Sequence, residues 1–237
     1  MKRRETRKIK LGDIYIGGDS ALSVQSMTNT DTRDADATIA QIKELEDAKC
    51  DIIRVAVPDL KAAEALRRIK DSIRIPLVAD IHFDYRLALA SIGSGVDGLR
   101  INPGNIGDES RIRAVVEAAS DRGIPIRIGL NSGSLERDVL SKYGAVTAEG
   151  LVESALRNVR ILEKFKFRDI VISLKSSNVM EMIEAYRLIS KQVDYPLHLG
   201  VTEAGTPYAG VIKSSIGIGG LLAEGIGDTI RVSLTGS

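Results

Sequence analysis

Residues 51–81, DIIRVAVPDLKAAEALRRIKDSIRIPLVADI, contain the clearest indication of the fold. Its two ends, residues 51–57 and 75–81, are short apolar runs rich in β-branched residues, which are typical of buried strands. Between them, residues 59–72 follow Pro58 and show the apolar spacing of an amphipathic helix. The stretch therefore predicts a strand, a helix and a second strand.

The same alternation continues along the chain. Eight segments are predicted strands: residues 21–27, 51–57, 75–81, 97–102, 124–131, 169–177, 195–203 and 228–235. Seven helical stretches separate them: residues 35–48, 59–72, 84–95, 108–123, 147–165, 178–193 and 210–225. A doubly wound sheet usually has five or six strands, so eight favour closure into an α/β (β/α)8 TIM barrel that lacks only its last helix.

Further boundaries come from single residues. Asp34 or Asp36 is available to cap the first helix, Thr147 to cap the fifth, and Gly123 to end the fourth. Residues 7–18 alternate on both sides of Gly12-Asp13 and predict an N-terminal β-hairpin, which we expect to plug the amino-terminal mouth of the barrel. No linker divides residues 1–237, so one barrel domain is expected.

The composition excludes several classes of protein. Lys and Arg number 33 against 32 Asp and Glu, which argues against a broad nucleic-acid or membrane footprint. No run approaches the roughly 20 apolar residues of a membrane span, and no signal peptide is expected. The one cysteine, Cys50, fits a cytoplasmic chain without disulfides and cannot by itself hold a zinc ion or an iron–sulfur cluster.

Five predicted strands carry a cation between aliphatic residues: Arg54, Arg100, Arg127, Lys175 and Arg231. Because side chains alternate along a strand, the cations face the barrel interior if their neighbours face the helices. Most lie in the carboxyl-terminal halves of their strands, near the end where barrel enzymes place their chemistry.

The charge balance inside the barrel indicates an anionic ligand. Only Asp80 and Glu203 are interior carboxylate candidates, which leaves an excess of roughly three positive charges, each costing several kcal/mol in a dry interior. Arginine's planar fork suits phosphate. The sequence therefore predicts a phosphate or diphosphate ligand at the carboxyl-terminal mouth.

Polar residues near the strand ends complete the candidate site. Asn102, Asn131, Ser177 and Ser233 lie at even spacings beyond four of the cations, so they are expected on the same strand faces, where they can orient ligand hydroxyl groups. Each is also, taken singly, a residue type that caps helices and turns.

The remaining titratable residues leave several roles open. Asp80 and His82 fall on one face if their strand continues, which favours ligand positioning over a metal site, because no third ligand is apparent. Glu203 can neutralise an arginine, position the substrate or act as the catalytic proton donor. His198 is expected to be a core residue of its strand.

Seven motifs in order resemble the N-terminal barrel of the GcpE family, the 4-hydroxy-3-methylbut-2-en-1-yl diphosphate synthases: SVQSMTNTDT, VADIHFDYRLAL, LRINPGNIG, RIGLNSGSL, SLKSSN, LHLGVTEAG and GIGDTIRVSLTG. This resemblance implies a methylerythritol phosphate pathway oxidoreductase that converts 2-C-methyl-D-erythritol 2,4-cyclodiphosphate to 4-hydroxy-3-methylbut-2-enyl diphosphate. The diphosphate-binding positions of the family match Arg54, Arg100, Arg127, Lys175, Arg231 and Ser233, and positions lining the same pocket match Asn102, Asn131 and Glu203.

The resemblance also implies features that this chain does not carry. In the family, three cysteines and a glutamate of a C-terminal domain ligate a 4Fe–4S cluster, which ferredoxin or flavodoxin reduces. This sequence has no cysteine after Cys50. The chain is therefore expected to be the substrate-binding half of a homodimeric enzyme and inactive by itself, with no metal bound.

Two alternatives remain at the level of sequence. One is a pterin-diphosphate-binding barrel of the dihydropteroate synthase type, which also uses cations for a diphosphate. The other is a non-catalytic phosphate-binding barrel whose cationic mouth has only a structural role.

Overall fold

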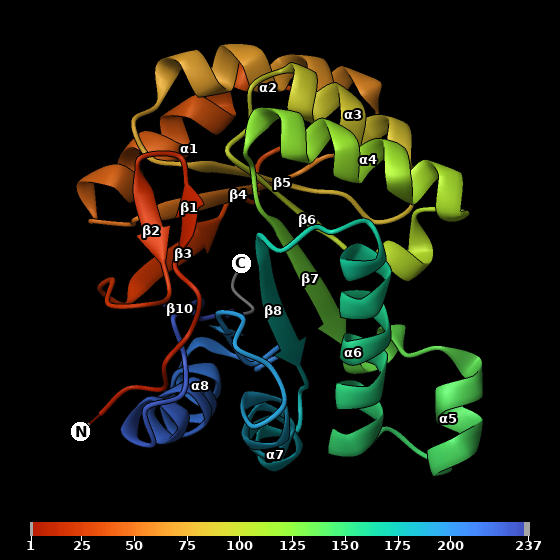
Figure 1. Cartoon of the computed structure of the whole chain (residues 1–237). Coiled ribbons are helices and arrows are strands. Elements are labelled where there is room, and N and C mark those ends of the chain that lie inside the picture. Colours follow the sequence, from red (N-terminus) through yellow and green to blue (C-terminus); the bar gives the residue numbers. More distant parts are fainter. Residues whose placement is uncertain (1, 235–237) are drawn as a thin grey trace.

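The eight predicted strands form the parallel sheet of a barrel in the computed structural model, which describes residues 2–234 (Figure 1). The barrel strands are β3 (Ser23–Met27), β4 (Ile52–Ala56), β5 (Leu77–Asp80), β6 (Gly98–Ile101), β7 (Ile126–Asn131), β8 (Ile170–Lys175), β9 (His198–Leu199) and β10 (Thr229–Ile230). They pair in the order β8-β7-β6-β5-β4-β3-β10-β9. A parallel bridge between Ile172 and Leu197 joins the two ends of this order, so the predicted closure is confirmed.

The last two strands are shorter than predicted. β9 pairs with β10 only at His198 and Leu199, and β10 ends at Ile230, although the Arg231 amide still donates to Leu199 O at 3.0 Å. The apolar alternation that predicted longer strands continues into segments where single backbone hydrogen bonds persist but the regular ladder does not. Thr235, the predicted end of the last strand, lies outside the described residues.

All seven predicted helices are present, with boundaries close to those expected. They are α1 (Ala35–Asp47), α2 (Leu60–Ser72), α3 (Tyr85–Gly93), α4 (Glu109–Arg122), α6 (Ala148–Lys164), α7 (Val179–Ser190) and α8 (Pro207–Ala223). A short helix that was not predicted, α5 (Arg137–Tyr143), lies in the long connection after β7 and packs outside α6 (Figure 1). Two 3₁₀ turns, Pro103–Asn105 and Ser132–Ser134, follow β6 and β7.

The predicted caps explain why these helices begin and end where they do. The side chains of Asp34 and Thr147 accept hydrogen bonds from the first-turn amides of α1 and α6. Gly123 ends α4 at φ 62°, a left-handed conformation that glycine adopts without a steric penalty. These local bonds satisfy amides and carbonyls that a helix terminus otherwise leaves unpaired.

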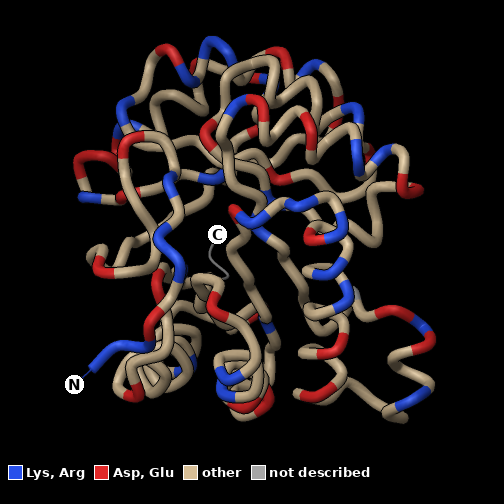
Figure 2. Tube along the Cα trace, viewed as in Figure 1, with Lys and Arg blue, Asp and Glu red and all other residues tan. Residues whose placement is uncertain are grey.

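The main hydrophobic core lies between the outer faces of the strands and the helices. In Figure 1, α1–α4 cover one side of the barrel and α6–α8 cover the opposite side. Charged residues of both signs are interspersed over the helices in Figure 2, as the near-zero net charge leads one to expect. Within residues 2–234, no helix has the length and hydropathy needed to cross a membrane.

The N-terminal hairpin closes the amino-terminal end of the barrel. Strands β1 (Ile9–Leu11) and β2 (Ile14–Ile16) pair antiparallel around the predicted turn. Leu11 and Ile16 are buried in a small cluster with Ile52 and Val78, which lie near the amino ends of β4 and β5. The hairpin therefore covers the amino-terminal mouth, as predicted.

Candidate functional site

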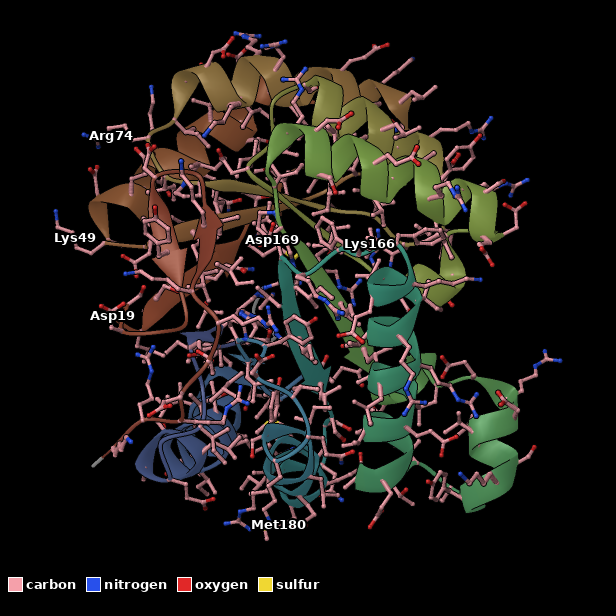
Figure 3. All side chains as sticks on the ribbon, viewed as in Figure 1. Asp19, Lys49, Arg74, Lys166, Asp169 and Met180 are labelled. Carbon is pink, nitrogen blue, oxygen red and sulfur yellow. The ribbon has the colours of Figure 1, made fainter. Side chains whose placement is uncertain are left out.

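The five strand cations converge on one cavity at the carboxyl-terminal end of the barrel. The cavity has a volume of about 90 Å³ and is lined by Arg54, Arg100, Arg127, Lys175 and Arg231, with five polar neighbours and one glycine. Side-chain nitrogen atoms gather between the ribbons of the barrel strands in Figure 3. Four of the five cations are buried and Arg231 is half-buried, so the prediction that these cations face the interior is confirmed.

Asp80 is the one carboxylate among the lining residues that the structure describes. Its oxygens lie 3.4 Å from Nε of Arg54 and 3.1 Å from Nη1 of Arg100. Burial alone would raise the pKa of the Asp80 carboxyl, but His82 and the two guanidinium groups outweigh it and hold that pKa well below its usual range. Asp80 is therefore ionised and fixes two of the five cations.

Glu203 does not contribute the second interior carboxylate. It is exposed, it does not line the cavity, and its backbone has turned to φ 49° in the loop after β9. The prediction of an interior Glu203 is wrong because β9 ends at Leu199 and the strand alternation does not extend to residue 203. Five basic side chains thus face one carboxylate instead of the two that the sequence indicated.

The remaining predicted residues divide into two groups. Asn131 and His82 line the cavity with Asp80, whereas Asn102, Ser177 and Ser233 do not. Asn102 is buried and its Oδ1 accepts a hydrogen bond from the Gly104 amide at 3.2 Å, so it caps the 3₁₀ turn after β6.

Ser177 and Ser233 lie beyond the ends of their strands. Ser177 is exposed after β8 has ended at Lys175, and Ser233 is half-buried after β10 has ended at Ile230. Even spacing predicts a shared face only while the backbone stays extended, which is why these two predictions of position are wrong.

The structure adds lining residues that the sequence analysis missed. Ser173 and Thr202 reach the cavity, and Gly129 lies against it. Ser173 could have been found, because it precedes Lys175 by two residues on the same face of β8. Gln25 on β3 accepts a hydrogen bond at 2.6 Å from Nη1 of Arg127, a contact across the barrel that no local pattern indicates.

Two glycines make room for the long cationic side chains. A Cβ atom at Gly129 would lie 2.1 Å from Nε of Arg100, and one at Gly200 would lie 2.7 Å from Nζ of Lys175. Nη2 of Arg100 donates to the Gly129 carbonyl at 2.7 Å. The cations therefore reach the cavity because these inward positions carry no side chain.

Several cationic donors have no hydrogen-bond partner among residues 2–234. They are Nζ of Lys175, Nε and Nη2 of Arg127, and Nε of Arg231, and all four atoms are buried. Burial first, and neighbouring positive charges second, lower the pKa values of Lys175 and Arg127 well below their ordinary values. An anion in the cavity would satisfy these donors and favour their charged forms.

The second histidine is a core residue, as predicted. His198 is fully buried on β9, and its Nδ1 lies 3.4 Å from Oγ1 of Thr229. Burial, followed by the charges of Arg127 and Lys175, holds its pKa well below the ordinary value, so its ring is neutral.

Residues 2–234 contain no group of three or more His, Cys, Asp or Glu side chains placed to hold a metal ion. Cys50 is buried at the start of β4, where its thiol donates to Ile52 O at 3.1 Å. The described residues therefore do not fit an iron–sulfur cluster.

Fold and site together define an α/β barrel with a cluster of basic side chains at its carboxyl-terminal mouth, the end at which barrel enzymes place their chemistry. A model of the GcpE TIM-barrel domain matches residues 6–237. The chain belongs to the GcpE family, as the seven motifs indicated.

Curated relatives support the same assignment. The proteins of Clostridium tetani and Clostridium acetobutylicum, both named 4-hydroxy-3-methylbut-2-en-1-yl diphosphate synthase (flavodoxin), are each 66% identical over 236 residues. These alignments cover 100% of this chain and 68% of each relative, so the chain spans about two thirds of their length.

Solved structures with similar folds are more distant in sequence. A type I 3-dehydroquinate dehydratase from Clostridium difficile superimposes with a TM-score of 0.70 at 18% identity, covering 98% of this chain and 92% of that one. A dihydropteroate synthase from Xanthomonas albilineans gives 0.65 at 13% identity, covering 95% and 92%. At such identities the likeness concerns the fold alone, so the pterin alternative gains no support from it.

Proposed function

We propose that this chain is the substrate-binding barrel of a 4-hydroxy-3-methylbut-2-en-1-yl diphosphate synthase, an oxidoreductase of isoprenoid biosynthesis. Its substrate is 2-C-methyl-D-erythritol 2,4-cyclodiphosphate, held by its diphosphate in the cation cavity. The single observation that carries this proposal is the meeting of five cations with one carboxylate in that cavity. Membership of the family supplies the identity of the anion.

The side chains have distinct roles in this proposal. Lys175 and Arg127 offer their unpartnered donors to the diphosphate oxygens, and Arg231, nearer the surface, completes the enclosure. Arg54 and Arg100 are fixed by Asp80, so they supply positive charge without having to reorganise. Asn131 and Thr202 lie in the same lining and orient the hydroxyl groups of the substrate.

The reaction takes up two electrons and two protons, opens the cyclic diphosphate and releases one water. The developing charge on the released diphosphate oxygen is stabilised by the surrounding cations. A 4Fe–4S cluster supplies the electrons in the family. The described residues do not fit such a cluster, and this proposal assigns them the binding and orientation of the substrate.

Three further properties belong to the same proposal. Flavodoxin is the electron donor, as the names of the relatives state for those proteins. The enzyme is a homodimer and works in the cytoplasm. Glu203 is exposed at the rim, so any part it takes as proton donor requires it to act from outside the cation cavity.

Isothermal titration calorimetry with the cyclodiphosphate tests the proposal. Arg231→Ala removes the half-buried cation and leaves the buried ones in place, so the barrel is expected to fold. A hydrogen bond to a charged group contributes about 1.5–3 kcal/mol, which predicts roughly 10- to 150-fold weaker binding. Arg187→Ala, which removes a half-buried arginine of α7 that pairs with Glu224 and does not line the cation cavity, should bind like the wild type. Absence of binding at low salt, or unaltered affinity of Arg231→Ala, would disprove the assignment.

A further inference from the structure

A second cavity adjoins the cation cavity at the rim of the barrel. It has a volume of about 330 Å³ and lies between the loops that follow β4 and β5. Its lining is mainly apolar and includes Val57, Pro58, Phe83 and Leu87. This cavity is called the rim cleft below.

The rim cleft and the cation cavity share the side chain of His82, which lines both. On one side, Nε2 of His82 lies 3.7 Å from Oδ1 of Asp80 in the cation cavity. On the other side, the His82 ring centroid lies 6.0 Å from that of Phe83 in the rim cleft. The two cavities therefore adjoin at the His82 imidazole.

Phe83 leaves a large apolar surface of the rim cleft exposed to solvent. This ring is 73% exposed, although an aromatic side chain gains free energy when it is covered. The cation cavity requires an anion, and the neighbouring rim cleft offers hydrocarbon contacts and little polar surface. The matching ligand has a diphosphate head and an apolar tail.

We propose that the rim cleft binds the hydrocarbon substituent of a diphosphate whose head group occupies the cation cavity. The inference rests on the proposed function, because it takes the diphosphate site as given. Among linear alkyl diphosphates, those with longer tails then compete better with the cyclic substrate.

The affinity for a series of ligands tests this inference. Inorganic diphosphate, ethyl diphosphate and pentyl diphosphate are titrated into the chain by calorimetry, and each is then competed against the cyclodiphosphate. A buried methylene contributes about fourfold in affinity, so pentyl diphosphate is expected to bind at least tenfold more tightly than ethyl diphosphate.

Two variants locate the tail. Phe83→Ser, altered at an exposed position, should reduce the pentyl-to-ethyl affinity ratio about fivefold and leave the affinity for inorganic diphosphate unchanged. Tyr208→Ser provides the matched control, because Tyr208 is an 81% exposed aromatic at the start of α8 that lines neither cavity. It should keep the wild-type ratio.

The possible outcomes separate the two proposals. Binding of inorganic diphosphate with no dependence on tail length would overturn the inference about the rim cleft and leave the proposed function standing. Equal pentyl-to-ethyl ratios for Phe83→Ser and Tyr208→Ser would also overturn the inference about the rim cleft alone. Failure of every diphosphate to bind would overturn both.

Discussion

The position of Arg100 in the site depends on the absence of a side chain at Gly129. Its guanidinium donates to the Gly129 carbonyl at 2.7 Å and to Asp80 Oδ1 at 3.1 Å, and the space it occupies exists because residue 129 has no Cβ. Arg100 is therefore held from two sides before any ligand arrives. Such preorganisation means that ligand binding does not have to order this side chain.

A Gly129→Ala substitution should therefore disturb binding more than its size suggests. The added methyl group would lie 2.1 Å from Nε of Arg100, so the guanidinium must move away from Asp80. We expect at least tenfold weaker binding of the cyclodiphosphate and a loss of about 1–3 kcal/mol in the free energy of unfolding. Calorimetry and urea denaturation measure the two effects.

Gly133→Ala is the control for this substitution. A Cβ atom at Gly133, four residues further along the chain, would meet no atom within 4 Å. This variant should bind and unfold like the wild type. Equal affinities of the Gly129→Ala and Gly133→Ala variants would show that Arg100 does not depend on the missing side chain.

The N-terminal hairpin is the element that separates the two ends of the barrel. Leu11 is 3% exposed and its Cδ1 would lie 2.7 Å from a Cβ at Gly98, so it fills the space at the amino end of β6. The cation cavity lies at the opposite end and shares no lining residue with the β1–β2 hairpin. The hairpin therefore contributes to stability at the amino-terminal end, and the candidate binding residues lie at the carboxyl-terminal end, as in other α/β barrels.

Leu11→Ala should thus destabilise the chain and leave its binding site intact. Deleting a buried leucine side chain costs about 2–5 kcal/mol in the free energy of unfolding. Tyr15→Ala, on the half-exposed face of the same hairpin, should cost much less. Urea denaturation gives the free energies and calorimetry the affinity. A tenfold loss of affinity in folded Leu11→Ala protein would contradict this division between the two ends.

Across the whole molecule, most of the described charged side chains that are buried, and therefore costly to desolvate, gather in the cation cavity. Its net charge is only +1, yet its carboxyl-terminal interior contains five cations and one carboxylate. Burial and the neighbouring charge of Arg231 lower the pKa of Lys175 well below its ordinary 10.5. At pH values between the lowered pKa and 10.5, the unfolded chain binds a proton at this lysine more readily than the folded chain does.

The stability of the ligand-free chain should therefore increase with pH in that interval. Lys175 contributes at most about 1.4 kcal/mol per pH unit to the free energy of unfolding. Urea denaturation at pH 7 and pH 9 measures the slope, which should be smaller for Lys175→Met. A saturating diphosphate should also reduce the slope, because it favours the charged lysine.

Lys164→Met, altered at an exposed position of α6, should keep the wild-type slope and serves as the control. If the slopes of Lys175→Met and Lys164→Met coincide, the burial of Lys175 does not govern the pH dependence.

The order of the elements, the barrel class and the inward-facing cations could all be predicted from the amino-acid sequence. These features follow from local rules, since strand alternation places Arg54, Arg127 and Lys175 on inward faces wherever the strand is continuous. The caps of α1, α4 and α6 are equally local, because the bonds join residues a few positions apart.

The ends of the strands and the contacts across the barrel depend on the three-dimensional fold and could not be predicted from the sequence. Ser177, Ser233 and Glu203 do not line the cavity because β8, β10 and β9 end before them, and the regular ladder that keeps side chains on alternate faces ends with each strand. The pairing of Arg127 with Gln25, 102 residues apart, and the space that Gly129 leaves for Arg100 likewise join different strands. Closure of the barrel creates these contacts, and a pattern read along one strand contains no information about them.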